Sequence, residues 1–259
     1  TVSTITNSVG VNNGAFGGGV IAGVSGRFGN CLDFNGTFGV VTIPAPAINL
    51  EPPNLTVEAW INPDNAIDGP IVDKSSGPSD GYAISLDSLG FTYLRVAGIA
   101  CTSSVPVRVG KWTHIAGTYD SVESRLRLYV DGELAAITEP VAVRPVSGRE
   151  VNIGRDGAAA FYFDGRIDEV AIHKRALNGE EILDHYRSGA VTLKFQCRSS
   201  TTDPTFTGIN FVGPDKTTNT FFVESLGSSL ISSMDLGRYF QYKVYFASEN
   251  YRLTPRLSG

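Results

Sequence analysis

Two adjacent carboxylates, Asp168 and Glu169, are the first place in this sequence to look for acid–base chemistry. A retaining glycosidase needs two carboxyl groups about 5–5.5 Å apart, so both must lie on the same face of a strand. Successive side chains of a strand point to opposite faces, so Glu169 is expected to point away from Asp168. Asp168 would instead share its face with Arg166 and Val170. The pattern therefore predicts no glycosidase pair here and a non-catalytic protein.

The three histidines, His114, His173 and His185, are scattered along the chain. None of them forms an i, i+4 pair with another, and no cysteine lies nearby in the sequence. Zinc sites and nucleophilic triads gather such residues, so neither is supported. His114 alternates within a strand pattern and is expected on the surface.

The three cysteines, Cys31, Cys101 and Cys197, are too widely spaced for a zinc knuckle or a CxxC redox motif. At most one disulfide could form within the chain. Cys31 and Cys197 lie in apolar strand patterns, which favours buried free thiols.

Aromatic side chains near loops could provide platforms for a sugar, because sugar sites combine aromatic faces with a few polar groups. Four aromatic residues lie near predicted loops or strand ends: Tyr82, Tyr93, Phe161 and Tyr162. They are the predicted ligand-binding residues, although ordinary packing or hairpin contacts would explain each one singly. Trp60 and Trp112 are expected in core strands instead.

Strands must position all of these side chains, because Gly, Pro, Ser and Thr are frequent and apolar residues recur in short alternating runs. Asp131-Gly132 is a strong signal for a two-residue hairpin turn. The sequence predicts an all-β fold, an antiparallel jelly-roll sandwich. Its predicted strands span residues 27–36, 40–43, 55–61, 70–74, 81–87, 91–96, 112–119, 125–130, 134–137, 151–154 and 166–173. Residues 1–30, which are rich in Gly and Asn, are expected to be mostly turns and loop.

One helix is expected after the last of these strands. Asn178 can cap it, and Glu181 is the matching capping-box residue three positions later. Ile182 and Tyr186 give the helix an apolar side, and Gly189 can end it. A strand followed by a single amphipathic helix predicts the end of a domain.

Five segments resemble the LamG-like, or concanavalin A-like, jelly-roll domains of secreted and surface proteins. In chain order they are 26–36 (GRFGNCLDFNG), 55–63 (LTVEAWINP), 111–119 (KWTHIAGTY), 128–132 (LYVDG) and 163–173 (FDGRIDEVAIH). The resemblance extends over residues 1–189. Such domains usually begin with an apolar strand that is missing here, which would leave a sheet edge open.

The resemblance implies a structural calcium ion. Its expected ligands are Asp168 and Asn35 with turn carbonyls, and Asp164 is a further candidate; these oxygen donors suit a hard cation. The simpler alternative is that Asp168 accepts hydrogen bonds from loop amides and that Asp164 forms a turn.

Residues 190–259 differ in character, because they carry a small net positive charge whereas residues 1–189 are acidic overall. Alternating patterns predict strands at 191–198, 219–224 and 239–247. So few strands give a marginal core. The segment is therefore predicted to be a small β domain that is incomplete on its own.

These patterns lead to one function class and one alternative. A net charge of −5 argues against a nucleic-acid partner, and no apolar run is long enough to insert into a membrane. The expected function is non-catalytic binding or adhesion, with a glycan or a surface protein as ligand, in a secreted or cell-surface protein. The alternative is a structural subunit of an extracellular filament or sheath, in which neighbouring copies of the chain complete each other by β-strand addition.

Overall fold

The computed structural model of the 259-residue chain describes residues 3–6, 8, 10–45, 47–65, 68–139, 146–223, 237–248 and 253. The chain divides into two compact units, Thr1–Tyr186 (unit 1) and Arg187–Gly259 (unit 2). The division falls inside the helix, whereas the sequence places it after Gly189. Each unit is described by itself.

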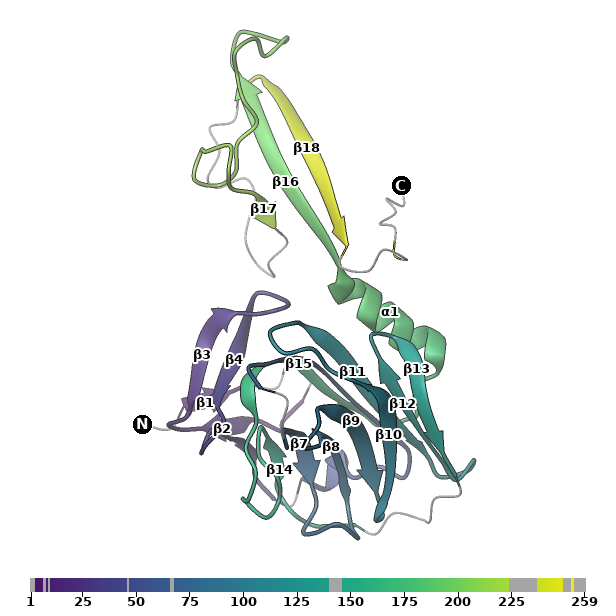
Figure 1. Cartoon of the computed structure of the whole chain (residues 1–259). Helices are drawn as coiled ribbons and strands as arrows, with labels where there is room; N and C mark the ends of the chain where they lie inside the picture. Colours follow the sequence, from purple (N-terminus) through teal and green to yellow (C-terminus); the bar gives the residue numbers. More distant parts are fainter. Residues whose placement is uncertain are drawn as a thin grey trace. The chain divides into compact units, whose positions relative to one another are not determined.

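Unit 1 contains two antiparallel sheets in its described part (Figure 1). The first sheet has the order β1-β2-β5-β14-β7-β8-β9-β10. Its strands are β1 (Ser3–Ile5), β2 (Gly14–Phe16), β5 (Val41–Ile43), β14 (Val151–Ile153), β7 (Pro70–Lys74), β8 (Tyr82–Leu86), β9 (Phe91–Val96) and β10 (Ile99–Pro106). We call it the eight-stranded sheet.

The second, seven-stranded sheet has the order β13-β12-β11-β6-β15-β4-β3. Its strands are β13 (Glu133–Thr138), β12 (Arg125–Val130), β11 (Thr113–Asp120), β6 (Leu55–Pro63), β15 (Asp164–His173), β4 (Asn30–Asn35) and β3 (Val20–Ser25). A short 3₁₀ helix, Ile48–Leu50, precedes β6. The all-β sandwich predicted from the sequence is confirmed.

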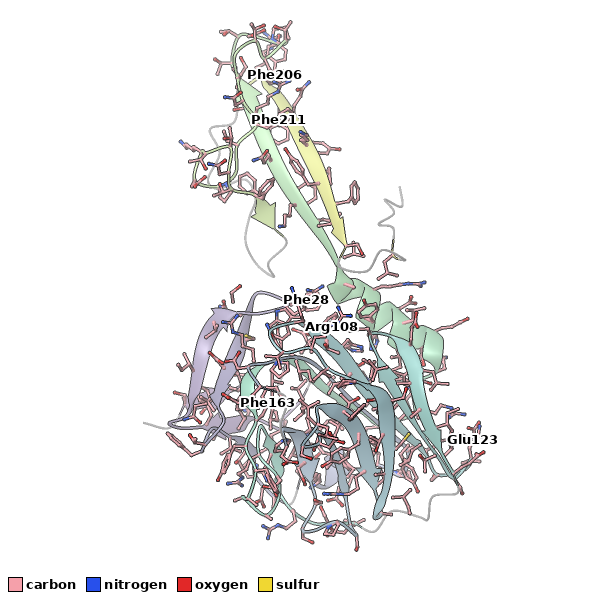
Figure 2. The ribbon with its side chains drawn as sticks, viewed as in Figure 1. Phe28, Arg108, Glu123, Phe163, Phe206 and Phe211 are labelled. Carbon is pink, nitrogen blue, oxygen red and sulfur yellow. The ribbon has the colours of Figure 1, made fainter. Side chains whose placement is uncertain are left out.

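The core of unit 1 lies between the two sheets. Leu55, Val57, Ala59 and Ile61 of β6 all point inward and have no exposed surface, as their alternation predicts. Phe163 lies in the same interior (Figure 2) and is 1% exposed.

Residues 1–30 differ from the prediction, because they form three strands rather than a loop. β2 pairs with β5, and β1 pairs with β2, so the chain's own N-terminal segment covers the edge that was expected to be open. β10 was also missed. β1 and β2 have only three residues each, and β3 and β10 are mostly exposed, so none of them has the clear apolar alternation that reveals a strand.

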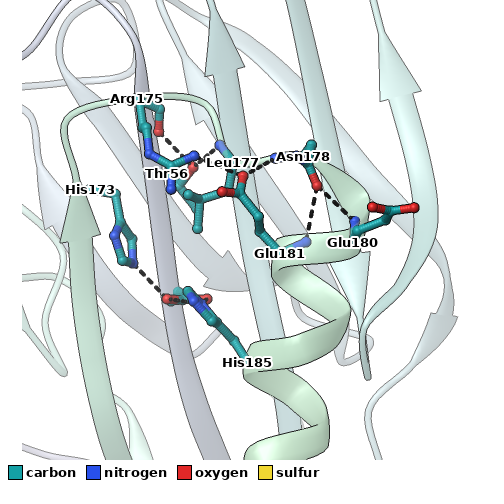
Figure 3. A network of polar contacts seen from close by, with 9 residues as sticks. Thr56, His173, Arg175, Leu177, Asn178, Glu180, Glu181 and His185 are labelled. Carbon is teal, nitrogen blue, oxygen red and sulfur yellow. Dashed lines mark hydrogen bonds and ion pairs between the residues drawn. The ribbon is translucent and has the colours of Figure 1, made fainter.

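The helix α1 (Gly179–Ala190) begins with the predicted capping box (Figure 3). The side-chain oxygen of Asn178 accepts hydrogen bonds from the Glu180 and Glu181 amides at 2.9 and 3.0 Å. Glu181 in return accepts the Asn178 amide at 3.0 Å. The Arg175 guanidinium and this amide lower the pKa of Glu181 to about 2.

The apolar side of this helix covers the outer face of the seven-stranded sheet. Ile182 and the preceding Leu177 form a buried cluster with Ala116 of β11 and Tyr129 of β12. Burial against the sheet, rather than helix propensity, therefore stabilises a helix this short.

Unit 2 contains a three-stranded sheet in its described part, in the order β17-β16-β18. β16 (Val191–Ser200) pairs with β18 (Tyr239–Ser248) along its whole length, while β17 (Phe222–Val223) is shorter than predicted, and Glu224 lies outside the described residues. The Arg198 guanidinium lies 4.8 Å from the ring of Phe206 and 4.4 Å from that of Phe211.

Cys31, Cys101 and Cys197 are all buried and free, as predicted. Burial and the nearby charge of Asp168 raise the pKa of Cys31 to about 11. No helix within the described ranges has the length and apolar character that crossing a membrane requires.

Candidate functional site

A hollow of about 190 Å³ opens on the outer face of the eight-stranded sheet, over β7, β8 and β9. In β9, Leu94 and Val96 are fully buried in the core. Tyr93 and Arg95 alternate with them and line the hollow. We call this hollow the β7–β9 groove.

Strand register gives the groove its depth. Arg95 pairs with Ala83, and Ala83 pairs with Asp73 on the next strand. In the neighbouring row, Ser85 lies between Tyr93 and a proline of β7. The small side chains of the central strand leave space between the larger ones on either side.

A polar group lies at one end of this groove. The Ser75 hydroxyl donates to Asp73 at 2.6 Å, and the Arg95 guanidinium donates to Ser75 at 3.2 Å and lies 3.6 Å from Asp73. Burial raises the pKa of Asp73, although Ser75, Arg95 and the Gly157 amide oppose that rise. Among the described residues, Nε of Arg95 is buried without a hydrogen-bond partner.

The loop 156–161 forms the other wall. Asp156 accepts hydrogen bonds from the amides of Ala160 and Phe161 at 2.7 and 3.0 Å, which fixes the loop. Gly157 approaches the Ser75 carbonyl so closely that a Cβ there would lie 2.3 Å from it. Phe161, which is 50% exposed, also lines the groove.

Only two of the four aromatic residues that were predicted to bind a ligand lie together in the structure. Tyr93 and Phe161 both line the β7–β9 groove. Tyr82 is fully buried and donates to the Leu50 carbonyl at 2.8 Å, so its assignment as a ligand-binding residue is wrong. Tyr162 forms a β-bridge with Arg155 and is not among the groove-lining residues.

Sequence reasoning missed Asp73, Ser75 and Arg95. The alternation of polar with apolar residues in 91–96 was visible and marks an outward face. Which residues of β7 face Arg95 depends on the register of two hairpins, and a bulge shifts the β7–β8 pairing.

Asp168 organises the turn that precedes β4. One of its oxygens accepts the amides of Arg27 and Phe28 at 2.7 and 2.9 Å, and the other accepts the Glu169 amide at 2.9 Å. Burial raises the pKa of Asp168, and these amides oppose the rise. A Cβ on Gly26 would lie 2.5 Å from the carboxylate, so the close approach needs glycine there.

The other two predicted metal ligands also accept hydrogen bonds. Asn35 Oδ1 accepts three loop amides at 3.1–3.2 Å, and Asp164 accepts the Asn65 side chain at 2.6 Å. Asn35 and Asp164 are paired across β4 and β15, but Asp168 lies farther along β15. A calcium ion at these residues would have to compete with the amides that already occupy their oxygens.

Calcium at Asn35, Asp168 and Asp164 therefore stays a prediction. If these oxygens bind calcium, the melting temperature should rise with calcium and fall with chelator, because an ion bound only to the native state stabilises it. Thermal unfolding under both conditions checks this, and identical melting curves would contradict it.

The histidines are not scattered in space, which corrects the sequence prediction. All three surround Glu58: His173 Nε2 lies 2.7 Å and His185 Nδ1 2.9 Å from its Oε1, and His114 Nε2 lies 3.5 Å from its Oε2. Figure 3 shows His173 and His185 directed at the same acceptor. His114 is only 2% exposed, so its expected surface position is wrong. Burial raises the pKa of Glu58, but the hydrogen bonds with the histidines outweigh it and hold the pKa far below its usual range.

The prediction of which side chains in 166–173 share a face of the strand also needs correction. A β-bulge in β15 interrupts its pairing with β6 between Asp168 and Ala171. Beyond the bulge, Val170 packs against the core, so it does not share a face with Asp168. The uneven spacing of Ile167, Val170 and Ile172 in the sequence was the available signal for this bulge.

A comparison with models of protein families shows to which family this sandwich is related. The model described as the concanavalin A-like lectin/glucanases superfamily matches residues 35–183. The chain belongs to this superfamily. The resemblance stated from the five segments is thereby confirmed.

One curated relative is human pentraxin-related protein PTX3, which is 34% identical over 87 residues. The match covers 29% of this chain and 23% of PTX3, so it spans about a quarter of that protein.

Two solved structures share the fold. Domain 4 of AbnA, an extracellular arabinanase from Geobacillus stearothermophilus solved with arabinotriose, has a TM-score of 0.53 at 18% identity, covering 65% of this chain and 81% of that one. The binding domain of botulinum neurotoxin serotype G has a TM-score of 0.55 at 15% identity, covering 73% of this chain and 53% of that one. At these identities the similarity concerns the fold alone.

Proposed function

We propose that this chain is an extracellular, non-catalytic module that binds a glycan in the β7–β9 groove. The observation that carries the proposal is the position of Tyr93 and Phe161 beside the polar group of Asp73, Ser75 and Arg95. Aromatic faces can cover the apolar face of a sugar ring, while the polar group hydrogen-bonds its hydroxyls. The fold shared with the arabinotriose-bound AbnA domain supports a glycan as ligand.

The charge of the groove favours a neutral glycan. Three acids, Asp68, Asp73 and Asp156, line it together with one cationic side chain, Arg95. A sulfated or uronic-acid glycan would meet like charge there, which disfavours binding. We therefore expect neutral oligosaccharides to bind more tightly than acidic ones of the same length.

Alanine substitution of the aromatic residues tests this site. Tyr93→Ala and Phe161→Ala should each weaken glycan binding about 10- to 100-fold, because each removes an aromatic face worth about 1.5–3 kcal/mol when covered. The measurement is a glycan array of neutral and acidic oligosaccharides that includes arabinotriose, followed by titration calorimetry with each hit. Phe38→Ala is the matched control, since Phe38 is a similarly exposed phenylalanine (57%) that does not line the groove.

Two outcomes would count against the proposal. An array without hits for the wild-type chain would remove the glycan, and a pull-down from surface extracts would then test a protein ligand at the same groove. Equal losses for Phe161→Ala and Phe38→Ala would place the binding elsewhere.

The structural alternative has support in unit 2. Phe240, Tyr242 and Phe246 of β18 are 48, 65 and 44% exposed, which is unusual for aromatic side chains on one strand. A second copy of the chain could cover them and extend the sheet. Sedimentation over a wide concentration range decides this alternative, and a chain that stays monomeric throughout ends it.

A further inference from the structure

Glu58 lies on the outer face of the seven-stranded sheet, surrounded by small residues. Its partner on β11 is Ala116, and its partner on β15 is Ala171. The methyl side chains of these alanines leave the carboxylate room on both sides, although Glu58 itself is only 5% exposed.

Two histidines enter this space diagonally. His114 on β11 pairs with Trp60, and His173 on β15 pairs with Thr56. Trp60 and Thr56 are each two residues from Glu58 along β6, so both histidines lie diagonally opposite Glu58 on neighbouring strands. Diagonal neighbours are within reach of long or ring side chains. The bulge between Asp168 and Ala171 is essential for this arrangement, because it brings His173 onto the outward face that Asp168 already occupies.

The third histidine, His185, comes from α1. The adjacent Tyr186 stacks on Trp60 with ring centroids 5.6 Å apart and an interplanar angle of 24°. This stack fixes the register of the helix over the sheet. As a result, His185 Nδ1 lies 2.9 and 3.1 Å from the two oxygens of Glu58.

These side chains supply two imidazole nitrogens and a carboxylate, which are ligand types that zinc binds. His173 Nε2, His185 Nδ1 and a Glu58 oxygen all lie within 4.8 Å of one another, the only such group of three or more His, Cys, Asp or Glu in the described part of the chain. In tetrahedral zinc coordination, ligand atoms 2.0–2.2 Å from the ion lie about 3.3 Å apart. The two nitrogens are already 2.7 and 2.9 Å from Oε1, so an ion needs only a small outward movement of the rings.

Exposure permits that movement and gives an ion access. The side chains of His173 and His185 are 32 and 42% exposed, whereas Glu58 and His114 are at most 7% exposed. The two outer ligands can therefore adjust around a rigid inner carboxylate. The exposed side also leaves a fourth coordination position for water.

We propose that Glu58, His173 and His185 bind one divalent transition-metal ion of the Zn²⁺ class, which fastens α1 to the seven-stranded sheet. Imidazole nitrogens suit zinc, copper and nickel, whereas calcium prefers oxygen ligands alone. His114 is a positioning residue, because it lies at the other oxygen of Glu58 and holds the carboxylate in place. The site lies on a different sheet from the β7–β9 groove, so it is independent of the proposed glycan binding.

Equilibrium dialysis of the chelator-treated full chain against Zn²⁺ tests the proposal. We expect one zinc ion per chain, and a higher melting temperature when zinc is present. H173Q and H185Q should each weaken zinc binding at least 100-fold and abolish the thermal shift. These substitutions are at partly exposed positions, and circular dichroism confirms that each variant is folded. The chain has only three histidines, and the third, His114, lies at the other oxygen of Glu58 with its side chain only 3% exposed.

Asp184→Asn is the matched control, since it removes an exposed acid beside His185 and should leave zinc binding unchanged. Excess Ca²⁺ should not displace the zinc. The proposal is overturned if the wild-type chain binds no zinc at millimolar concentration, or if folded H173Q and H185Q both bind zinc as tightly as wild type. An equal loss in Asp184→Asn would also overturn it, because binding would then depend on surface charge.

Discussion

Lys74→Met should lower the free energy of unfolding of unit 1 by about 3–5 kcal/mol, the usual cost of removing one partner from a buried ion pair. Lys74 Nζ lies 2.9 Å from Glu51 Oε1, and the two side chains are 0 and 1% exposed. Without the lysine, the carboxylate stays buried and loses its counter-charge. Urea unfolding followed by tryptophan fluorescence measures the effect, because both tryptophans are in unit 1.

The pair also connects the groove to a distant segment. Lys74 donates to the Arg149 carbonyl, while Glu51 accepts the Ser147 hydroxyl at 2.9 Å and the Gly148 amide at 3.1 Å. Since Asp73 and Ser75 flank Lys74 in the sequence, the variant should also weaken glycan binding.

A double variant separates charge burial from lost packing. Lys74→Met combined with Glu51→Gln should be more stable than Lys74→Met alone, because no unpaired charge remains. Lys111→Met, at an exposed lysine, should change stability by less than about 0.5 kcal/mol. A cost below 1 kcal/mol for Lys74→Met would mean that the ion pair contributes little.

Trp60→Ala is expected to cost a similar amount, about 3–5 kcal/mol, through lost burial and the cavity it leaves. Trp60 is 3% exposed. It stacks on Tyr186, lies 5.3 Å from the His114 ring, and has the Arg27 guanidinium 4.6 Å above it. Its removal should therefore loosen α1 as well as the sheet, and amide hydrogen exchange in 179–186 should speed up.

Two comparisons make the Trp60 experiment specific. Trp60→Phe keeps an aromatic face against Tyr186 and should recover part of the loss. Trp112→Ala, at the partly exposed tryptophan before β11, should cost less than Trp60→Ala. If Trp60→Ala destabilised the sheet without faster exchange in α1, the stacking on Tyr186 would not be what holds the helix.

Local sequence patterns were sufficient to predict most of the strands of the sandwich. The strands at 70–74, 91–96 and 125–130 have the predicted bounds, and the cap at Asn178 forms as expected. These features depend on alternation and capping chemistry within a few residues. The strands in residues 1–30 were missed because they are very short or largely exposed and so lack a clear apolar alternation.

The candidate sites were harder to predict. The groove contains two of the four predicted aromatic residues, Tyr93 and Phe161, but its polar group comes from strands whose register the sequence does not state. Tyr82 is a tyrosine near a strand end, as Tyr93 is, yet its side chain points into the core. Neighbouring side chains along a strand point to opposite faces of the sheet. An error of one residue in register therefore places a surface side chain in the core, or a core side chain on the surface.

The sequence by itself determined the fold family and the alternation that makes one face of each central strand apolar, and it favoured free cysteines. Tertiary structure decided which distant polar residues meet. His114, His173 and His185 come from two strands and a helix, and they converge on Glu58 only because a bulge in β15 and the Tyr186–Trp60 stack set their positions. Such convergence depends on pairing register and helix docking, which are properties of the whole fold rather than of any short stretch of sequence.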